Sequence, residues 1–237
     1  MSKLVMVAVF SLCSLLSWSQ AAPAPKPAPA KKTPGAAVPA GPPTAIIDTT
    51  SGKLTCTLFP DKAPIGVANF VGLARGTKPW SDPVSGKKVT GKPLYNGTIF
   101  HRVIPNFMIQ GGDPKGDGTG DPGYKFKNET SPDLGFDQAG RLAYANAGPG
   151  TNGSQFFVTE VPYPSLNGGY TIFGQCDEAS VELVKTIALA ARDSNDRPYA
   201  PVKITKITVT GIPNPARRAT TKPGAASSKP AAATKTP

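Results

Sequence analysis

Residue types that carry acid–base, nucleophilic or metal chemistry are scarce in this sequence. It contains one histidine, His101, and three cysteines, Cys13, Cys56 and Cys176. A zinc site needs three or four His, Cys or carboxylate ligands at readable spacings, and no such set is present. A Ser-His-Asp triad would have to use His101, but the Gly-x-Ser-x-Gly elbow is missing. The glycine-rich runs lack the Lys-Ser/Thr ending of a phosphate loop. We therefore expect no metal and no cofactor.

Two segments dense in polar and aromatic residues stand out instead. The first is residues 100–113, FHRVIPNFMIQGGD, and the second is residues 145–157, ANAGPGTNGSQFF. In their order and near-matching separation they resemble the two signature segments of the cyclophilins. Shorter matches extend this resemblance over residues 44–211: Phe59, Ala63-Pro64, Asn69-Phe70, Tyr95-Asn96-Gly97, Leu166-Asn167-Gly168 and Phe173-Gly174.

The resemblance implies peptidyl-prolyl cis–trans isomerase activity. An X–Pro bond rotates slowly because its C–N bond has partial double-bond character, with a barrier of about 18–20 kcal/mol. Catalysis needs a group that favours the twisted amide, in which the proline nitrogen recovers its lone pair. By resemblance that group is Arg102, since a permanently charged fork of donors suits a hydrogen bond to this nitrogen. Gln110 and Asn146 complete the implied catalytic set, by holding the carbonyl side and the peptide backbone.

The resemblance also assigns the residues that bind the substrate. An apolar pocket would hold the proline ring while a few polar groups fix its orientation. The implied pocket consists of Phe107, Met108, Phe157 and Leu166, and the neighbouring groove of Ala145, Ala147 and Gln155. Beside the proline site, Tyr170 stands where animal cytosolic members have a histidine, and Ser165 where they have a tryptophan. We expect isomerase activity to be kept, whereas binding of ciclosporin does not follow.

Taken singly, the same residues have simpler explanations. Apolar residues such as Phe107 and Phe157 are usually core, and an arginine such as Arg102 is usually a solvated strand charge. Agreement with the family pattern favours the functional interpretation for both groups. It does not do so for His101, which we interpret as a hydrogen-bonded structural residue.

Two other functions compete with an isomerase. One is a proline-pocket binding module or holdase chaperone with incidental isomerase activity. Arg102 argues against it, because a binder needs the pocket but not the arginine. The other is a structural envelope protein whose basic tails act, with the domain as a passenger.

Strand signals dominate residues 44–212, where short β-branched and aromatic runs alternate with Gly, Pro, Asn and Asp. Two helices are expected, one capped by Asp61 with Pro64 in its first turn and an end at Gly76, the other over 179–188. The predicted fold is mainly β: a closed eight-stranded antiparallel β-barrel capped by two α-helices, as in cyclophilins. The eight strands are expected at 44–48, 53–59, 98–102, 107–110, 141–145, 155–159, 170–173 and 202–210.

The ends of the chain are unlike the middle. Residues 1–21 combine a basic start, an apolar run and small residues before Ala21, which predicts a signal peptide cleaved after Ala21. A lipid anchor at Cys13 is the competing interpretation. Residues 22–43 and 213–237 are rich in Ala, Pro and Lys and contain no aromatic residue, so we expect disordered linkers. The isomerase domain is then 44–212, in a periplasmic or secreted protein.

Positive charge is concentrated in these ends. Residues outside 44–212 carry nine of the 26 basic residues and none of the 15 acidic ones, which leaves the domain a net charge of +2. Charge spread thinly over tails favours solubility and weak adhesion to an anionic envelope over nucleic-acid binding. We expect proline-containing polypeptides as partners, no nucleic acid, no stable membrane insertion after signal cleavage, and a monomer.

Two further features stay open at this point. Cys56 and Cys176 are either small buried hydrophobes or a disulfide, since cysteines so far apart in the chain carry no geometric information. The stretch Thr77–Lys92 is longer and richer in Lys and Gly than the family's usual loop, and its role is unassigned. Trp80 within it is expected to pack its large ring onto the body of the domain.

Overall fold

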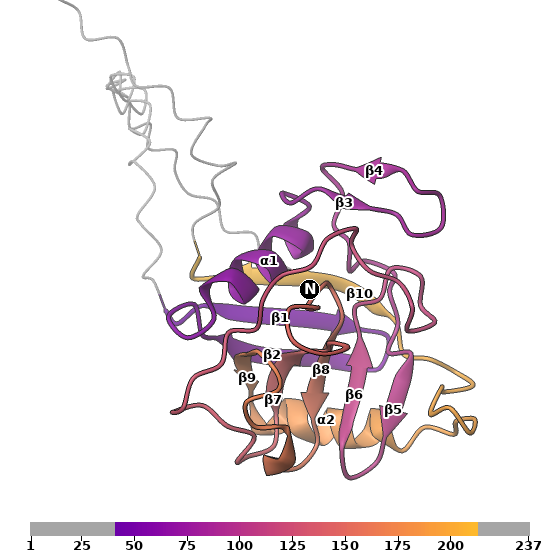
Figure 1. The fold of residues 1–237 in the computed structure, drawn as a ribbon. Coiled ribbons are helices and arrows are strands. Elements are labelled where there is room, and N and C mark those ends of the chain that lie inside the picture. The colour runs from indigo at the N-terminus through magenta and orange to yellow at the C-terminus, as the bar shows by residue number, and fades with distance from the viewer. Residues whose placement is uncertain (1–40, 213–237) are drawn as a thin grey trace, which may run out of the picture. The chain divides into compact units, whose positions relative to one another are not determined.

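The computed structural model describes residues 41–212; the predicted signal peptide, the linker up to residue 40 and the C-terminal tail lie outside the described residues. Eight strands form one antiparallel sheet in the order β10-β1-β2-β9-β7-β8-β6-β5, and β3 and β4 pair as a separate hairpin (Figure 1). The strands are β1 Thr44–Thr49, β2 Gly52–Leu58, β3 Trp80–Ser81, β4 Lys88–Val89, β5 Arg102–Ile104, β6 Met108–Gly111, β7 Arg141–Tyr144, β8 Phe156–Thr159, β9 Ile172–Cys176 and β10 Ile204–Thr210. The helices are α1 Pro64–Arg75, the 3-10 turn η1 Pro164–Leu166, and α2 Glu178–Ala188.

The mainly β prediction is confirmed, but the closed barrel is not. The sheet is curled into a half-barrel whose order ends at β10 on one side and β5 on the other. No strand ladder joins those two ends among the described residues. Individual hydrogen bonds link the segments that precede β5 and β10; for example, the Phe100 amide donates to the Val202 carbonyl at 3.0 Å. The predicted strand at 98–102 therefore has wrong bounds: its first four residues belong to the segment before β5, and β5 starts at Arg102.

Side chains alternate between the two faces of the central strands. One face belongs to the inner core, which is the large buried cluster inside the curled sheet. From strands β6, β8, β7 and β9 this core takes Ile109, Phe156, Val158, Leu142, Tyr144 and Phe173. The other face carries a smaller outer cluster, whose buried members are Met108, Phe136, Ala143, Phe157 and Ile172. The sequence pattern did not reveal this division, because both sets are apolar.

The two helices lie at opposite ends of the sheet in Figure 1 and are anchored differently. The predicted cap of α1 at Asp61 is wrong: Ala63 is the N-cap and makes no side-chain cap bond. The carboxylate of Glu129 instead accepts from the amides of Ile65 and Gly66, at 3.0 and 2.8 Å, which satisfies two open donors of the first turn. Gly76 ends the helix as predicted, with a left-handed φ of 70° that glycine adopts without strain.

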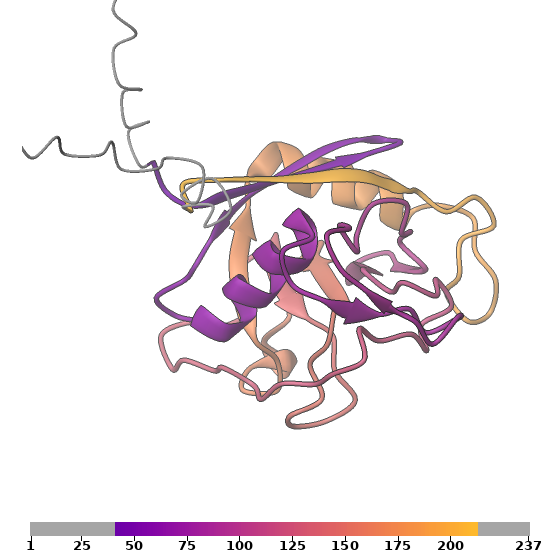
Figure 2. The ribbon, with the colours of Figure 1, turned by 90° about the horizontal axis from the view of Figure 1, so that it is seen from above.

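Helix α2 has a conventional start. The side chain of Asp177 accepts from the Ser180 amide at 2.8 Å, and a carboxylate there also complements the helix dipole. The helix packs against β2 and, across the curled sheet, against β6, β5 and β8. Figure 2 shows the long strands β1 and β10 running along one side of the domain, with α1 beside them.

The open question about the cysteines is answered by the strand register. Cys56 on β2 and Cys176 on β9 are directly opposite each other in the antiparallel pair, and they form a disulfide. Both are buried in the inner core. A register of this kind cannot be read from two isolated cysteines in a sequence.

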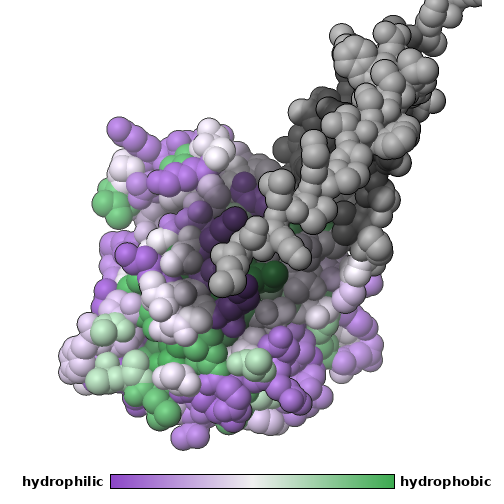
Figure 3. All heavy atoms as spheres, turned by 180° about the vertical axis from the view of Figure 1, so that it is seen from behind, coloured by the Kyte–Doolittle hydropathy of each residue, from purple (hydrophilic) through white to green (hydrophobic). Residues whose placement is uncertain are grey.

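The long loop after α1 is a separate hairpin that projects from the domain (Figure 1). Trp80 on β3 is 9 % exposed and its indole nitrogen donates to the Lys92 carbonyl at 3.1 Å. Its predicted packing against the domain body is confirmed, since it belongs to the inner core. On the side opposite to Figure 1, Figure 3 shows a largely hydrophilic surface with a group of hydrophobic residues in its lower part. Within residues 41–212, no helix has the length and apolar character to cross a bilayer.

Candidate functional site

Four strands place one row of side chains across the outer face of the sheet. Arg102 on β5 pairs with Gln110 on β6, Gln110 pairs with Phe157 on β8, and Phe157 pairs with Ala143 on β7. Because paired residues in an antiparallel sheet point to the same face, this register brings a charged, a polar and an aromatic side chain together. Residues that are far apart in sequence thus meet without any loop having to place them.

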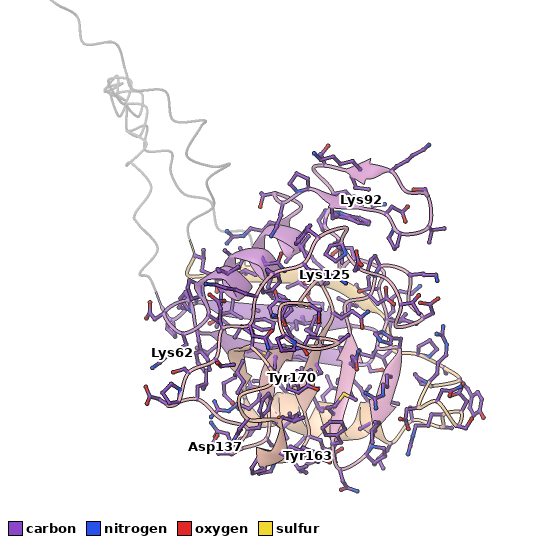
Figure 4. The ribbon with its side chains drawn as sticks, viewed as in Figure 1. Lys62, Lys92, Lys125, Asp137, Tyr163 and Tyr170 are labelled. Atoms are coloured by element: carbon purple, nitrogen blue, oxygen red, sulfur yellow. A yellow bond between two sulfur atoms is a disulfide. The ribbon has the colours of Figure 1, made fainter. Side chains whose placement is uncertain are left out.

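A pocket of about 190 Å³ opens on this row. It lies on the face of the sheet turned toward the viewer in Figure 4, where Tyr170 is labelled. Nine of the eleven predicted site residues line it: Arg102, Phe107, Met108, Gln110, Ala145, Asn146, Phe157, Leu166 and Tyr170. The structure therefore brings the predicted pocket and the predicted catalytic residues to one place.

Aromatic packing fixes the apolar wall of the pocket. The ring of Phe157 stacks on Phe136 with centroids 5.8 Å apart, and Tyr170 stands perpendicular to Phe157 at 5.5 Å. Edge-to-face and stacked pairs of this kind are favourable beyond simple burial. Met108 and Phe157 are 2 % and 5 % exposed, so the wall is formed before any ligand arrives. Sequence reasoning missed Phe136, which lies between the two signature segments.

Phe107 is held at the pocket rim by the tight turn between β5 and β6. Asn106 in that turn has a positive φ of 59°, which asparagine tolerates better than most residues. The buried carboxylate of Glu160 accepts from the Asn106 amide at 2.8 Å, and Tyr163 packs on the Phe107 ring at 4.4 Å. Neither Glu160 nor Tyr163 was predicted, and only their place just after β8 could have suggested a contact.

A chain of amide side chains orients the polar side of the pocket. Arg102 Nη1 donates to Gln110 Oε1 at 3.5 Å, and Gln110 Nε2 donates to Gln155 Oε1 at 2.9 Å. Gln155 Nε2 in turn donates to the carbonyls of Gly118 and Gly120, at 3.0 and 2.9 Å. Each amide can bond in this order in only one orientation, which turns the Gln110 oxygen toward Arg102.

The glycine-rich loop behind this chain is fixed by a buried carboxylate. Asp113 is fully buried and accepts from the backbone amides of Lys115, Asp117, Gly118 and Gly120, at distances from 2.6 to 3.3 Å. Several amide donors satisfy the charge and hold the loop in one shape. This loop, whose sequence does not fit a phosphate site, thus supports Gln155, and through it Gln110.

The two remaining predicted residues, Ala147 and Gln155, line an adjoining groove of about 230 Å³. Ala145, Asn146 and Gln110 border both cavities, so the groove continues the pocket. Asn146 is tied into its loop, since its Oδ1 accepts from the Gly148 amide at 3.1 Å. With its side chain engaged in the loop, the backbone of Asn146 is the part suited to contact a peptide.

His101 is next to Arg102 but points away from the pocket. It is 5 % exposed, and neither ring nitrogen has a hydrogen-bond partner among the described residues. The expected hydrogen-bonded role is therefore wrong in its detail. Desolvation by burial is the main cause that lowers the pKa of His101; the carboxylates of Asp113 and Asp117 oppose it, and the charges of Arg197 and Arg102 add to it. The lowered pKa favours the neutral ring, which packs beneath the 113–120 loop.

The described residues contain no group of three or more His, Cys, Asp or Glu side chains placed to hold a metal ion. What the site offers is an apolar slot, a guanidinium at its edge, and fixed amide groups along one side. Such an arrangement can bind a small ring and donate hydrogen bonds next to it.

Comparisons with known proteins agree with this geometry. The family model described as cyclophilin-type peptidyl-prolyl cis–trans isomerase matches residues 44–209. Peptidyl-prolyl cis-trans isomerase A of Mycobacterium tuberculosis is 53 % identical over 167 residues, which cover 70 % of this chain and 91 % of the relative. Peptidyl-prolyl cis-trans isomerase B of Streptomyces anulatus is 51 % identical over 167 residues, 70 % of this chain and 95 % of the relative.

Solved structures show the same fold. A crystal structure of a cyclophilin-type isomerase from Cryptosporidium parvum matches with a TM-score of 0.59 and 35 % identity, covering 72 % of this chain and 98 % of that one. A second crystal structure of the same protein, in the presence of the dipeptide Ala-Pro, matches with a TM-score of 0.58 and 34 % identity, covering 70 % of this chain and 98 % of that one.

Proposed function

Because the chain belongs to the cyclophilin-type peptidyl-prolyl cis–trans isomerases, it catalyses rotation about X–Pro bonds, and we propose that it does so through Arg102 on exported proteins. The observation that carries the proposal is the cross-strand row, which places the Arg102 guanidinium at the edge of the apolar pocket. A proline ring in that pocket would present its nitrogen to the arginine.

The reaction needs no covalent step. As the amide twists, resonance is lost and the lone pair returns to the proline nitrogen. A donor already in position beside the nitrogen stabilises the twisted form more than either planar form, which lowers the barrier. An arginine guanidinium cannot be deprotonated in proteins, so a donor of this type acts without first gaining or losing a proton.

The pocket and the amide groups supply the remaining requirement, which is to hold the peptide still. Phe107, Met108 and Phe157 would grip the ring, while Gln110 would hold the carbonyl side of the bond. The adjoining groove gives room for the residues that flank the proline. A relative crystallised in the presence of Ala-Pro supports a proline-containing peptide as the ligand class.

Export is the second part of the proposal, with the protein acting as a monomer in the periplasm or outside the cell. The apolar run and small residues of 1–21 support it. The Cys56–Cys176 disulfide supports it independently, since disulfides persist mainly in oxidising compartments. Mass spectrometry of the native protein should give a mature chain that starts at Ala22. An intact Met1, or a lipid mass on Cys13, would contradict the proposed processing.

The catalytic proposal is tested with a protease-coupled peptide assay on the full chain. Arg102→Ala should lower kcat/KM by a factor on the order of 10²–10³, the loss typical of one preorganised donor. Arg102→Lys should restore only part of the activity, because an ammonium lacks the planar fork. Lys53→Ala on the exposed part of β2 is the control and should match the wild type.

Near-normal activity in a folded Arg102→Ala variant would contradict this mechanism. The binding-module alternative would then be favoured, since binding requires the pocket alone.

A further inference from the structure

The guanidinium of Arg102 has a second polar neighbour on the side away from Gln110. Asp196, in the loop between α2 and β10, places its Oδ2 atom 3.6 Å from Arg102 Nε. Arg102 and Asp196 side chains are 43 % and 31 % exposed, so the contact is at the rim of the site rather than deep within it. A long arginine at a rim has many rotamers, and catalysis needs one of them.

The carboxylate of Asp196 is itself held in one orientation. Its other oxygen, Oδ1, accepts from Arg192 Nε at 3.3 Å, so each oxygen faces a different guanidinium. Rotating the carboxylate would break both contacts. The pair engages the Nε edge of Arg102, which leaves the Nη edge directed to Gln110 and the pocket.

The backbone of Asp196 is fixed to the strand that carries Arg102. The Val103 amide donates to the Asp196 carbonyl at 2.9 Å, immediately beside Arg102 in β5. The loop is closed by Asp193, whose side chain accepts from the amides of Asn195 and Arg197 at 2.8 and 3.0 Å. Asp196 can therefore shift relative to Arg102 only if this loop comes away from β5.

Asp196 adopts a conformation that side chains usually avoid. Its φ is 62°, and apart from Asn106 it is the only non-glycine residue with positive φ among the described residues. A non-glycine residue there is uncommon, although Asp and Asn tolerate it better than others. Asn106 aims Phe107 into the pocket, and by the same reasoning the turn at Asp196 aims a carboxylate at Arg102.

We propose that Asp196 is a positioning residue for the isomerase reaction: it holds the Arg102 guanidinium by its Nε edge so that the Nη donors meet the twisted proline nitrogen. This inference rests on the proposed function of Arg102. Asp196 does not line the pocket that would hold the proline ring. Its loss should therefore reduce kcat and leave KM nearly unchanged, since the proline pocket is intact.

Two variants separate the carboxylate from the backbone turn. Asp196→Gly removes the side chain and suits a positive φ, so the loop should keep its shape. Asp196→Asn keeps the size and the tolerance of positive φ but removes the charge. We expect kcat to fall about tenfold in Asp196→Gly and less in Asp196→Asn, because misplacing a catalytic group by a fraction of an ångström has effects of this order.

A matched control is available on β1. Asp48 has a similar exposure, 37 %, and a similar ion pair, with its Oδ1 3.7 Å from Lys53 Nζ. Asp48→Asn should leave both kcat and KM at the wild-type values. Thermal unfolding of all variants shows whether any loss of activity comes from loss of structure.

The decisive experiment is a double-mutant cycle with Arg102→Ala in the full chain. If Asp196 acts through Arg102, adding Asp196→Gly to Arg102→Ala should change kcat little further. Equal tenfold losses in both backgrounds would overturn the inference, and so would unchanged or raised kcat in Asp196→Gly. A normal rate in Arg102→Ala alone would instead contradict the proposed mechanism of Arg102, and with it the positioning role.

Discussion

The inner core and the outer cluster share strands β6 to β9, yet they exclude water to different degrees. The inner core contains 29 buried residues, whereas the outer cluster has five, surrounded by seven partly buried ones. Neighbouring residues in one strand belong to different sets: Phe156 is inside and Phe157 outside. One short run can therefore serve stability with alternate side chains and substrate binding with the others.

Part of this arrangement could be predicted from the sequence. The runs around Lys53–Leu58 and Gln155–Thr159 gave the strands to within a residue or two, because β-branched and aromatic clusters mark strands well. The two signature segments led to nine of the eleven predicted residues that line the pocket and groove, and the family pattern after them led to Leu166 and Tyr170. Local pattern and resemblance were enough for these.

The rest depends on contacts between distant parts of the chain. The cross-strand register that joins Cys56 to Cys176, the carboxylate of Glu129 at the start of α1, and Asp196 beside Arg102 each require the fold itself. No period or motif in a sequence reports such pairings. The closed barrel is not confirmed for the same reason, since strand signals do not show where a sheet ends.

The largest effect should come from the inner core. Phe156→Ala removes a ring that packs against Phe70, Tyr95 and Phe100 at centroid distances of 5.7, 5.6 and 6.2 Å. Truncating a buried phenylalanine costs about 3–5 kcal/mol of unfolding free energy, because a cavity remains. Urea unfolding measures it. A loss below about 1 kcal/mol would mean that these four rings do not pack together in the inner core.

The disulfide should contribute a somewhat smaller part of the same stability. It links residues 120 positions apart, and loss of a native disulfide typically costs about 2–5 kcal/mol. The double variant Cys56→Ala with Cys176→Ala should therefore unfold at lower urea concentration while its kcat/KM stays close to the wild type. A variant with normal stability but altered catalysis would break the separation between core and site.

A substitution in the outer cluster should weaken substrate binding more than it lowers stability. Phe157→Ala should raise KM about tenfold, the effect of losing roughly 1.5 kcal/mol of ring burial. Its cost in stability should be less than that of Phe156→Ala, because a gap that opens to water is not an empty cavity. Equal destabilisation by the two substitutions would remove the distinction between the two faces.

The neighbours His101 and Arg102 also separate stability from catalysis. A change in pH should affect the contribution of His101 to stability but not the catalysis by Arg102. Since burial lowers the pKa of His101 in the folded state, the unfolded chain binds the proton first. Stability is then fully present above the ordinary histidine pKa of about 6.5 and falls as pH decreases through the folded-state pKa. Urea midpoints between pH 8 and 5 should show this fall in the wild type and not in His101→Leu.

Catalysis by the protein that remains folded should not follow that curve, because an arginine donor needs no proton transfer to act. A parallel drop in kcat/KM of fully folded protein would show that His101 takes part in the reaction.

The central claim is that binding and catalysis are divided within the outer face, between the apolar pocket and Arg102. NMR exchange spectroscopy on an Ala-Pro peptide gives both the affinity and the catalysed cis–trans exchange rate in one sample. We predict that Arg102→Ala binds the peptide nearly as the wild type does but exchanges it far more slowly, and that Phe107→Ala fails to bind. If Arg102→Ala exchanges the bound peptide at the wild-type rate, Arg102 is not the catalytic donor and the account is wrong.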